Sequence, residues 1–175
     1  QHILDKKVGV TELSDRRQLA RRAFATSSHY DTAIFNYFNE DGGLPALKIS
    51  QMNAMPLRYG ENPHQKATFF GRMDGMFTKL NGKEVSYNNL VDIDAAVGMM
   101  REFQSGDPAF IILKHTNACG VAVRPTQVEA WHTALASDNV SAFGGILITN
   151  KRVELGTAQE IDKLFYEVLI APDFT

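Results

Sequence analysis

The stretch ILKHTNACGVAV, residues 112–123, joins an apolar run to a short polar segment. Residues 109–113 are all apolar, which is the pattern of a strand buried on both faces. This run ends at two adjacent basic residues, Lys114 and His115. Because ligands of α/β sheets bind beyond the carboxyl ends of strands, we interpret this pair as a candidate site. We expect residues 116–120 to form a loop beside it. The competing interpretation is a basic pair that only marks the solvent boundary.

The composition is that of a globular protein able to bury a core. The chain has 175 residues, of which 44% are hydrophobic and 22% charged, with a formal net charge of -2. This charge does not favour nonspecific binding to nucleic acid. No apolar run approaches the roughly 20 residues that cross a bilayer. We therefore expect neither nucleic acid nor a membrane as a partner.

The chain has a single cysteine, Cys119. One cysteine forms no internal disulfide and supplies no four-sulfur zinc site, and we expect a reducing, cytoplasmic location. Zinc deaminases combine His-x-Glu with Pro-Cys-x-x-Cys, a pattern that the residues around His115 do not match. The sequence also lacks a Walker A loop and a G-x-G-x-x-G fingerprint. We expect no catalytic metal.

Apolar periodicity predicts two helices before residue 40, one from Ser14 or Asp15 to about residue 26 and one over 28–38. The Asp41-Gly42-Gly43-Leu44-Pro45 segment then breaks the pattern, and we place a domain boundary there. Beyond it, helices and strands alternate, which predicts an α/β layer architecture with right-handed crossovers. The expected strands are 67–70, 76–80, 109–113, 146–149 and 168–170. The expected helices are one capped by Asp92 and running through Phe103, one capped by Thr126 and one capped by Thr157.

Three further segments contain candidate binding residues. Arg58 and Tyr59 combine a planar guanidinium suited to phosphate oxygens with a hydroxyl donor. Phe143 offers a ring for stacking, and Gly144 permits close backbone approach to a ligand. Glu167 precedes the last expected strand and offers an acceptor. The alternatives are an ordinary polar loop, a tight turn with a core phenylalanine and a solvated surface glutamate.

Five segments occur together in one order: RYGENPHQ, SYNNLVDIDAA, ILKHTNACGVAV, SAFGGIL and VLIAP. In this order they resemble the family of bifunctional purine biosynthesis proteins, which join IMP cyclohydrolase to aminoimidazole carboxamide ribonucleotide (AICAR) transformylase. The resemblance implies that residues 1–43 are C-terminal helices of the cyclohydrolase domain plus a linker. Residues 44–175 then form the first part of the transformylase domain, a cytidine-deaminase-like layered α/β fold without zinc. We therefore expect a fragment of a longer protein, inactive alone.

The resemblance also implies a reaction, in which a formyl group passes from the cosubstrate 10-formyltetrahydrofolate to the AICAR amine in de novo purine biosynthesis. His115 takes the role of base, and Lys114 assists proton transfer to the folate and stabilises developing charge. The family acts as a homodimer. The positions implied to hold the nucleotide are Arg58, Tyr59, Phe143, Gly144 and Glu167.

The chain departs from many relatives at Ala118, where they have proline in an Asn-Pro-Cys-Gly segment. Loss of a proline frees φ at that position and removes no catalytic side chain. Two other functions stay open. One is a nucleotide-binding module on the same scaffold without catalysis, and the other is a zinc hydrolase of the deaminase type.

Overall fold

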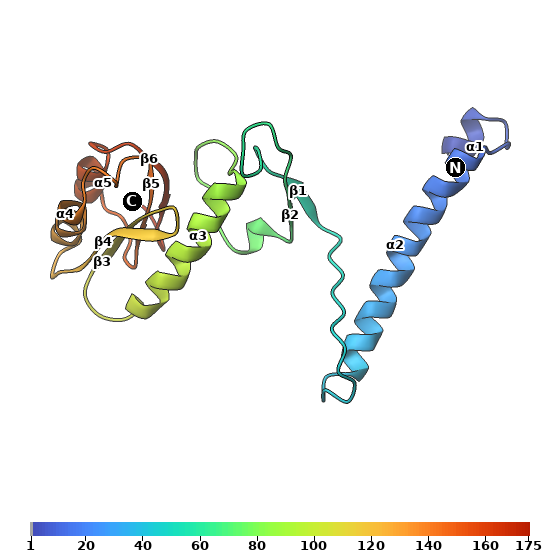
Figure 1. Ribbon diagram of the computed structural model, residues 1–175, viewed down its shortest axis with the longest axis horizontal. Helices are drawn as coiled ribbons and strands as arrows, with labels where there is room; N and C mark the ends of the chain where they lie inside the picture. Colours follow the sequence, from blue (N-terminus) through green and yellow to red (C-terminus); the bar gives the residue numbers. More distant parts are fainter. Residues whose placement is uncertain (1) are drawn as a thin grey trace. The chain divides into compact units, whose positions relative to one another are not determined.

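The computed structural model describes residues 2–175, in which the chain forms two compact units (Figure 1). The first unit comprises the described residues up to Met55 together with Thr68–Leu80. The second comprises Pro56–Ala67 and Asn81–Thr175 and contains every candidate site residue. Among the described helices, none has the length and apolar character that crossing a membrane requires.

The first unit contains a long helix and a small two-stranded sheet. The prediction of two helices is wrong, because α2 runs unbroken from Leu13 to Phe38. The hydroxyls of Ser27 and Ser28 lie 3.5 and 3.3 Å from carbonyl oxygens of the preceding turn, so these serines fit inside the helix and do not cap a new one. The other elements are α1 (His2–Lys6), β1 (Ala54–Pro56), β2 (Thr68–Phe70) and the 3₁₀ helix η1 (Met73–Gly75).

Two further predictions for this unit differ from the structure. Helix α2 is capped by a Glu12–Asp15 capping box, so its cap precedes the predicted Ser14 or Asp15. The predicted strand over 76–80 is absent from the described chain, where β2 pairs with β1 alone. No residue of α2 is buried within the described structure, and Phe24 and Phe38 are 73% and 77% exposed. The predicted apolar face of this helix therefore exists without a covering layer.

The second unit is built on a four-stranded sheet with the order β4-β3-β5-β6. Strand β3 (Ala109–Lys114) pairs antiparallel with both β4 (Asn117–Val123) and β5 (Gly145–Thr149). Strand β5 pairs parallel with β6 (Tyr166–Ile170) after a helical crossover. The predicted α/β class is confirmed, but the sheet is mixed, and its parallel crossover is confined to β5 and β6.

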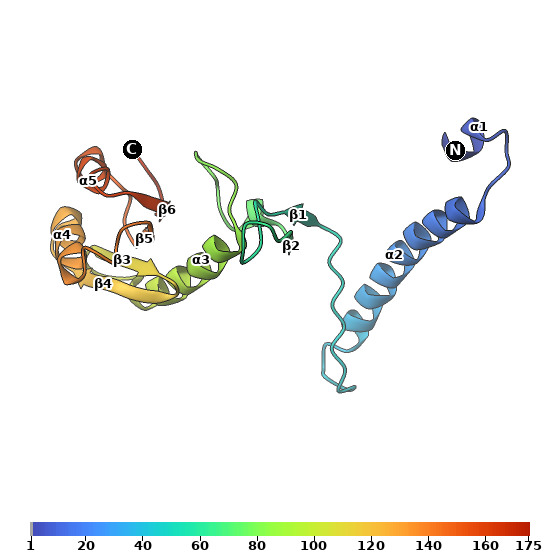
Figure 2. The same ribbon diagram turned by 45° about the horizontal axis from the view of Figure 1, so that its top comes forward.

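Helices cover both faces of this sheet (Figure 2). Helix α3 (Tyr87–Met100), followed by the 3₁₀ helix η2 (Arg101–Phe103), packs on one face with Ile111 and Leu113. Helices α4 (Gln127–Ser137) and α5 (Leu155–Ile161) pack on the other face with Phe110 and Ile112. Successive residues of β3 therefore enter different layers, and all five residues of the apolar run are buried.

Of the helices α3, α4 and α5 of this unit, only α4 starts where the sequence predicts. The Thr126 capping box opens α4 as predicted. Helix α3 begins at Tyr87, where Ser86 accepts a hydrogen bond from the Asn89 N–H, so the predicted start at Asp92 is wrong. Helix α5 begins at Leu155, and the predicted cap Thr157 lies inside the helix and is buried.

The segment predicted as a loop over 116–120 is mostly strand β4. Residues 117–123 pair with β3 in a hairpin, with Gly120 opposite Ile112. A Cβ on Gly120 would overlap the backbone carbonyl oxygen of Ala134 in α4. Glycine is therefore required here by the close approach of a strand and a helix, and not by turn geometry.

Candidate functional site

Lys114 and His115 lie where β3 ends and the chain turns back into β4. Lys114 pairs with Asn117, so His115 and Thr116 alone form the turn. Their φ angles are 52° and 62°, the left-handed values that a type I′ hairpin turn requires at both central positions. Neither residue is glycine, and this conformation costs a residue with a Cβ roughly 1–2 kcal/mol. His115 is thus exposed on a strained turn at the strand end.

Side-chain hydrogen bonds hold this turn. Thr116 Oγ1 and Asn117 Nδ2 both donate to the carbonyl oxygen of His115, at 2.6 and 2.8 Å. The backbone N–H of Thr116 donates to Asp92 Oδ1 at 2.8 Å. Asp92 lies on α3, so this last bond ties the turn to a helix of the layer beneath it.

Lys114 is directed toward the segment that precedes β5. Its ammonium Nζ donates to the carbonyl oxygen of Phe143 at 2.7 Å. The side chain is half-buried, whereas the neighbouring His115 is exposed. The two basic residues therefore have different surroundings, and the lysine is fixed against the backbone of another candidate residue.

The segment of Phe143, Gly144 and Gly145 depends on its glycines. Gly144 has a φ of +73°, and its N–H donates to the carbonyl oxygen of Phe165 at 2.8 Å. A Cβ on Gly145 would lie 2.6 Å from the carbonyl oxygen of Leu113. The ring of Phe143 is 57% exposed and lies 5.2 Å from the ring of Phe165. An exposed ring beside a glycine backbone suits a planar ligand.

Arg58 meets Glu167 on the far strand of the sheet. The distance from Arg58 Nη2 to Glu167 Oε2 is 3.9 Å. The same nitrogen donates to the Tyr59 hydroxyl at 3.1 Å and to Asn89 Oδ1 at 3.5 Å. Among the described residues, these contacts of the guanidinium use Nη2. Nε and Nη1 therefore keep donors for a ligand, which makes a phosphate a suitable partner.

The sheet register gathers these segments at one end. The end of β3 lies beside the start of β5, which pairs with the start of β6. We expected ligands beyond the carboxyl ends of strands. Because β3 is antiparallel to β5 and β6, this end of the sheet is the carboxyl end of β3 but the amino end of the other two strands. Contacts join Lys114 to Phe143 and Arg58 to Glu167. Within the described part of the chain, no hydrogen bond or ion pair joins the first pair to the second.

Comparison with known proteins identifies the family to which this arrangement belongs. Residues 2–175 match the family model described as the AICARFT/IMPCHase bienzyme. The chain belongs to this family. The match covers the N-terminal helices as well as the sheet, and the family that the five ordered segments predicted is confirmed.

Relatives of the bienzyme family are closely similar along nearly the whole chain. The chain is 57% identical over 164 residues to the bifunctional purine biosynthesis protein PurH of Bacteroides thetaiotaomicron, which covers 94% of this chain and 32% of that protein. It is 44% identical over 179 residues to PurH of Chlorobium luteolum, covering 95% and 34%, respectively. The chain is also 44% identical over 171 residues to PurH of Microcystis aeruginosa, an alignment that covers 94% of this chain and 34% of that protein. The chain thus spans about a third of the length of these relatives.

Two residues of this bienzyme segment support the site without having been predicted. Asn89 and Asp92 are three residues apart and therefore lie on one side of α3. Asn89 contacts Arg58, and Asp92 accepts the hydrogen bond from Thr116. The sequence signal for them is their place in SYNNLVDIDAA, but a helical position alone does not say which distant segment a polar side chain meets.

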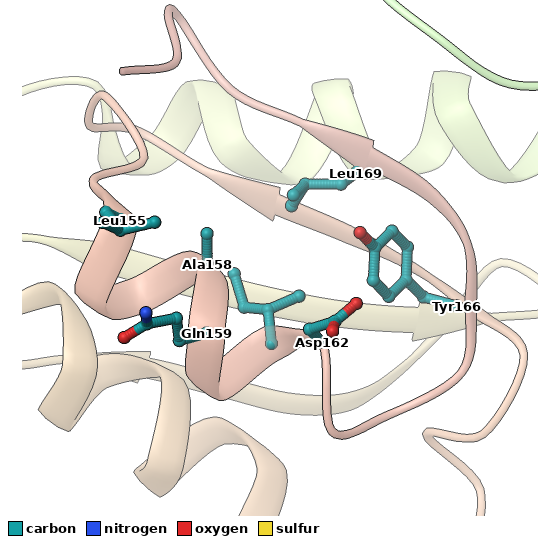
Figure 3. A pocket seen from close by; sticks show the side chains of 7 residues that line it. Leu155, Ala158, Gln159, Asp162, Tyr166 and Leu169 are labelled. Atoms are coloured by element: carbon teal, nitrogen blue, oxygen red, sulfur yellow. The ribbon is translucent and has the colours of Figure 1, made fainter.

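A cavity of the second unit lies away from these residues (Figure 3). Its volume is about 270 Å³, and Tyr166 and Asp162 lie at one end of it with Leu155 at the other. Tyr166 and Leu169 both pack with the core cluster on the α4 and α5 side, although they are three residues apart, because the pairing of β5 with β6 shifts register between Tyr166 and Val168. The cavity is therefore on the α5 face, whereas Glu167 meets Arg58. The other lining residues are Ala158, Gln159, Ile161 and Leu169.

Cys119 follows the turn in β4 and packs against the core of the α4 face. Burial, together with the negative charge of Asp138, raises the pKa of the Cys119 thiol, and the nearby Lys114 opposes this shift. A raised pKa reduces the thiolate fraction near neutral pH, which makes Cys119 a poor nucleophile. In the part of the chain that the structure describes, no group of three or more His, Cys, Asp and Glu side chains is placed to hold a metal ion.

Proposed function

We propose that this chain contributes the Lys114–His115 turn and a nucleotide-holding surface to an AICAR transformylase site within a longer bifunctional protein. The relatives are bifunctional purine biosynthesis proteins, and the chain spans about a third of their length. The observation that carries the proposal is the position of Lys114 and His115 at the end of a buried strand. A buried strand ends in a strained two-residue turn that exposes His115 and directs Lys114 to the backbone of Phe143.

The proposed reaction transfers a formyl group from 10-formyltetrahydrofolate to the amine of AICAR. The amine nitrogen forms a bond to the formyl carbon, and the bond from that carbon to the folate N10 breaks. The amine loses one proton and the folate nitrogen gains one. The amine is a weak nucleophile because its lone pair is delocalised into the imidazole and carboxamide. Placing a base and an acid beside correctly positioned reactants therefore lowers the barrier most.

The side chains suit separate parts of this reaction. His115, exposed at the strand end, accepts the amine proton together with the substrate carboxamide. The Lys114 ammonium supplies positive charge near the leaving nitrogen and assists its protonation. Arg58 holds the nucleotide phosphate with its planar fork, beside the Tyr59 hydroxyl. The residues proposed to line the base and ribose are Phe143, Gly144 and Glu167.

The proposal extends to the domains and the assembly. Residues 1–43 are assigned to the end of the IMP cyclohydrolase domain and 44–175 to the start of the transformylase domain. A deaminase-like layering without zinc is supported by helices on both faces of a mixed sheet. Homodimer formation and a cytoplasmic location are further parts of the proposal. They follow from the family and from the single cysteine, Cys119.

A side-by-side assay of the 175-residue chain and the full-length protein tests this proposal. With AICAR and 10-formyltetrahydrofolate, the full-length protein is expected to form formyl-AICAR. The isolated chain is expected to turn over at least about a thousandfold more slowly, because catalysis depends on positioning both reactants. Turnover by the chain at the full-length rate would show that the site is complete within it. Absence of transfer by the folded full-length protein would refute the activity itself.

A further inference from the structure

Among the described residues, the side chain that bonds to the His115 turn from another element is that of Asp92. Thr116 Oγ1 and Asn117 Nδ2 bond to the His115 carbonyl oxygen, and these contacts stay within the turn. The bond from the Thr116 N–H to Asp92 Oδ1, at 2.8 Å, is made to a different element. Bonds within a turn move with it, whereas a bond to a helix fixes where the turn lies.

Asp92 is itself held firmly. It precedes Ile93, which is buried and belongs to the face of α3 that also contains Ala96 and Met100. The Asp92 side chain is half-buried, and an ionised carboxylate makes a stronger acceptor for a backbone N–H than a neutral group does. The helix therefore presents a fixed acceptor to a turn whose two central residues both adopt an unfavourable conformation.

The same turn of α3 also serves the nucleotide side of the site. Asn89 Oδ1 accepts from Ser86 N and Ser86 Oγ at 3.0 Å each and lies 3.5 Å from Arg58 Nη2. Asp92 follows three residues later and reaches Thr116. One helical segment thus contacts both the arginine and the turn, which have no direct bond to each other in the described structure.

We propose that Asp92 is a positioning residue for formyl transfer, which sets the location of His115 by holding the Thr116 N–H. This inference rests on the proposed function. Asp92 contacts neither reactant in it and acts through the backbone of the turn. Its effect is expected mainly on kcat, because a displacement of about 1 Å in a catalytic group costs up to about a hundredfold in rate.

The test compares Asp92→Ala, Asp92→Asn and Asp94→Ala in the full-length protein. Asp94 lies on the same helix and is exposed, so Asp94→Ala controls for loss of a charge and gain of helix propensity. Asp92→Ala is expected to lower kcat by about 10- to 100-fold, with the KM for AICAR changed by less than about threefold. Asp92→Asn retains an acceptor oxygen and is expected to recover most of kcat, and Asp94→Ala to match the wild type.

A second measurement follows the hydrogen bond itself in the 175-residue chain. Exchange of the Thr116 amide proton is expected to be at least about tenfold faster in Asp92→Ala than in Asp94→Ala, because a lost hydrogen bond removes protection from exchange. Unchanged kcat in Asp92→Ala, when His115→Ala is inactive, would overturn the positioning role and leave the proposed function standing. Unchanged turnover in His115→Ala would refute the function, whatever the exchange data show. Failure of Asp92→Asn to recover kcat would also overturn the positioning role.

Discussion

Replacing His115 with Ala in the full-length protein is expected to lower kcat for formyl transfer by about 10²- to 10⁴-fold, the range lost with a general base. Affinity for AICAR is expected to stay within about threefold, because Arg58 and the Phe143–Gly144 segment supply the proposed binding contacts. The imidazole is exposed, so its removal leaves no cavity. Steady-state kinetics combined with equilibrium titration of the nucleotide separate the two effects.

His132→Ala is the matched control for this experiment. His132 is half-exposed on α4, and its Nε2 lies 3.4 Å from Oε2 of the half-buried Glu160, a surface pair of small energetic value. This variant is expected to keep wild-type kcat and affinity. If His115→Ala retained turnover within threefold, the assigned base role would be wrong. An equal loss of affinity and turnover would assign His115 to nucleotide binding and not to proton transfer.

Gly120→Ala is expected to cause the largest loss of stability from a single methyl group in this chain. The added Cβ would overlap the carbonyl oxygen of Ala134. The position of a Cβ is fixed by the backbone and the carbonyl oxygen is a backbone atom, so no change of rotamer relieves the overlap, and β4 must separate from α4. We expect the free energy of unfolding to fall by about 3 kcal/mol, at the upper end of overpacking costs. The Tm of the 175-residue chain should then fall by about 6–12 °C, measured by calorimetry.

Gly98→Ala is the matched control with the opposite expected sign. Gly98 is exposed on α3, and a Cβ there meets nothing within 4 Å. Alanine is more favourable than glycine inside a helix by about 0.5–1 kcal/mol, so this variant should be slightly more stable. A Gly120→Ala protein as stable as the Gly98→Ala protein would show that β4 does not approach α4 this closely.

Local sequence signals predicted those parts of the fold that depend on local interactions. The buried run of β3 and the Thr126 capping box are contained in a few consecutive residues, and both agree with the structure. The predicted break in α2 is wrong because the same residue type serves two roles. Ser28 can cap a helix or bond back to the preceding turn, and the continuous apolar stripe of α2 favours the second.

The hairpin was missed for a comparable reason. Short hairpins are usually signalled by Asn-Gly or Asp-Gly, whereas this turn has His115 and Thr116 at its centre. The sequence therefore favoured a loop. The unfavourable backbone conformation is offset by pairing with β3 and by the bond to Asp92, which lies 24 residues earlier in the chain. Contacts between distant residues of this kind have no signal in a local pattern.

The sequence predicted which residues belong to the candidate site better than it predicted how they contact one another. Strand-end reasoning singled out Lys114 and His115, and the structure places them at the end of β3. The proximity of Arg58 and Glu167 depends on backbone bonds that hold the Arg58 segment beside the start of α3, from Arg58 N–H to the Val85 carbonyl and from Tyr87 N–H to the Tyr59 carbonyl, and the sequence did not specify these contacts. Asp92 was predicted only as a helix cap, because its contact with the turn is made across the fold.

Hydrogen–deuterium exchange of the full-length protein, with and without AICAR, tests most directly whether this end of the sheet is the nucleotide site. Protection is expected in peptides that contain residues 58–60, 114–117, 143–145 and 167–168, because binding slows the opening of the backbone it contacts. Peptides lining the α5 cavity, around Leu155 and Asp162, serve as the internal reference. Protection gathered around that cavity, with the four segments unchanged, would contradict the account.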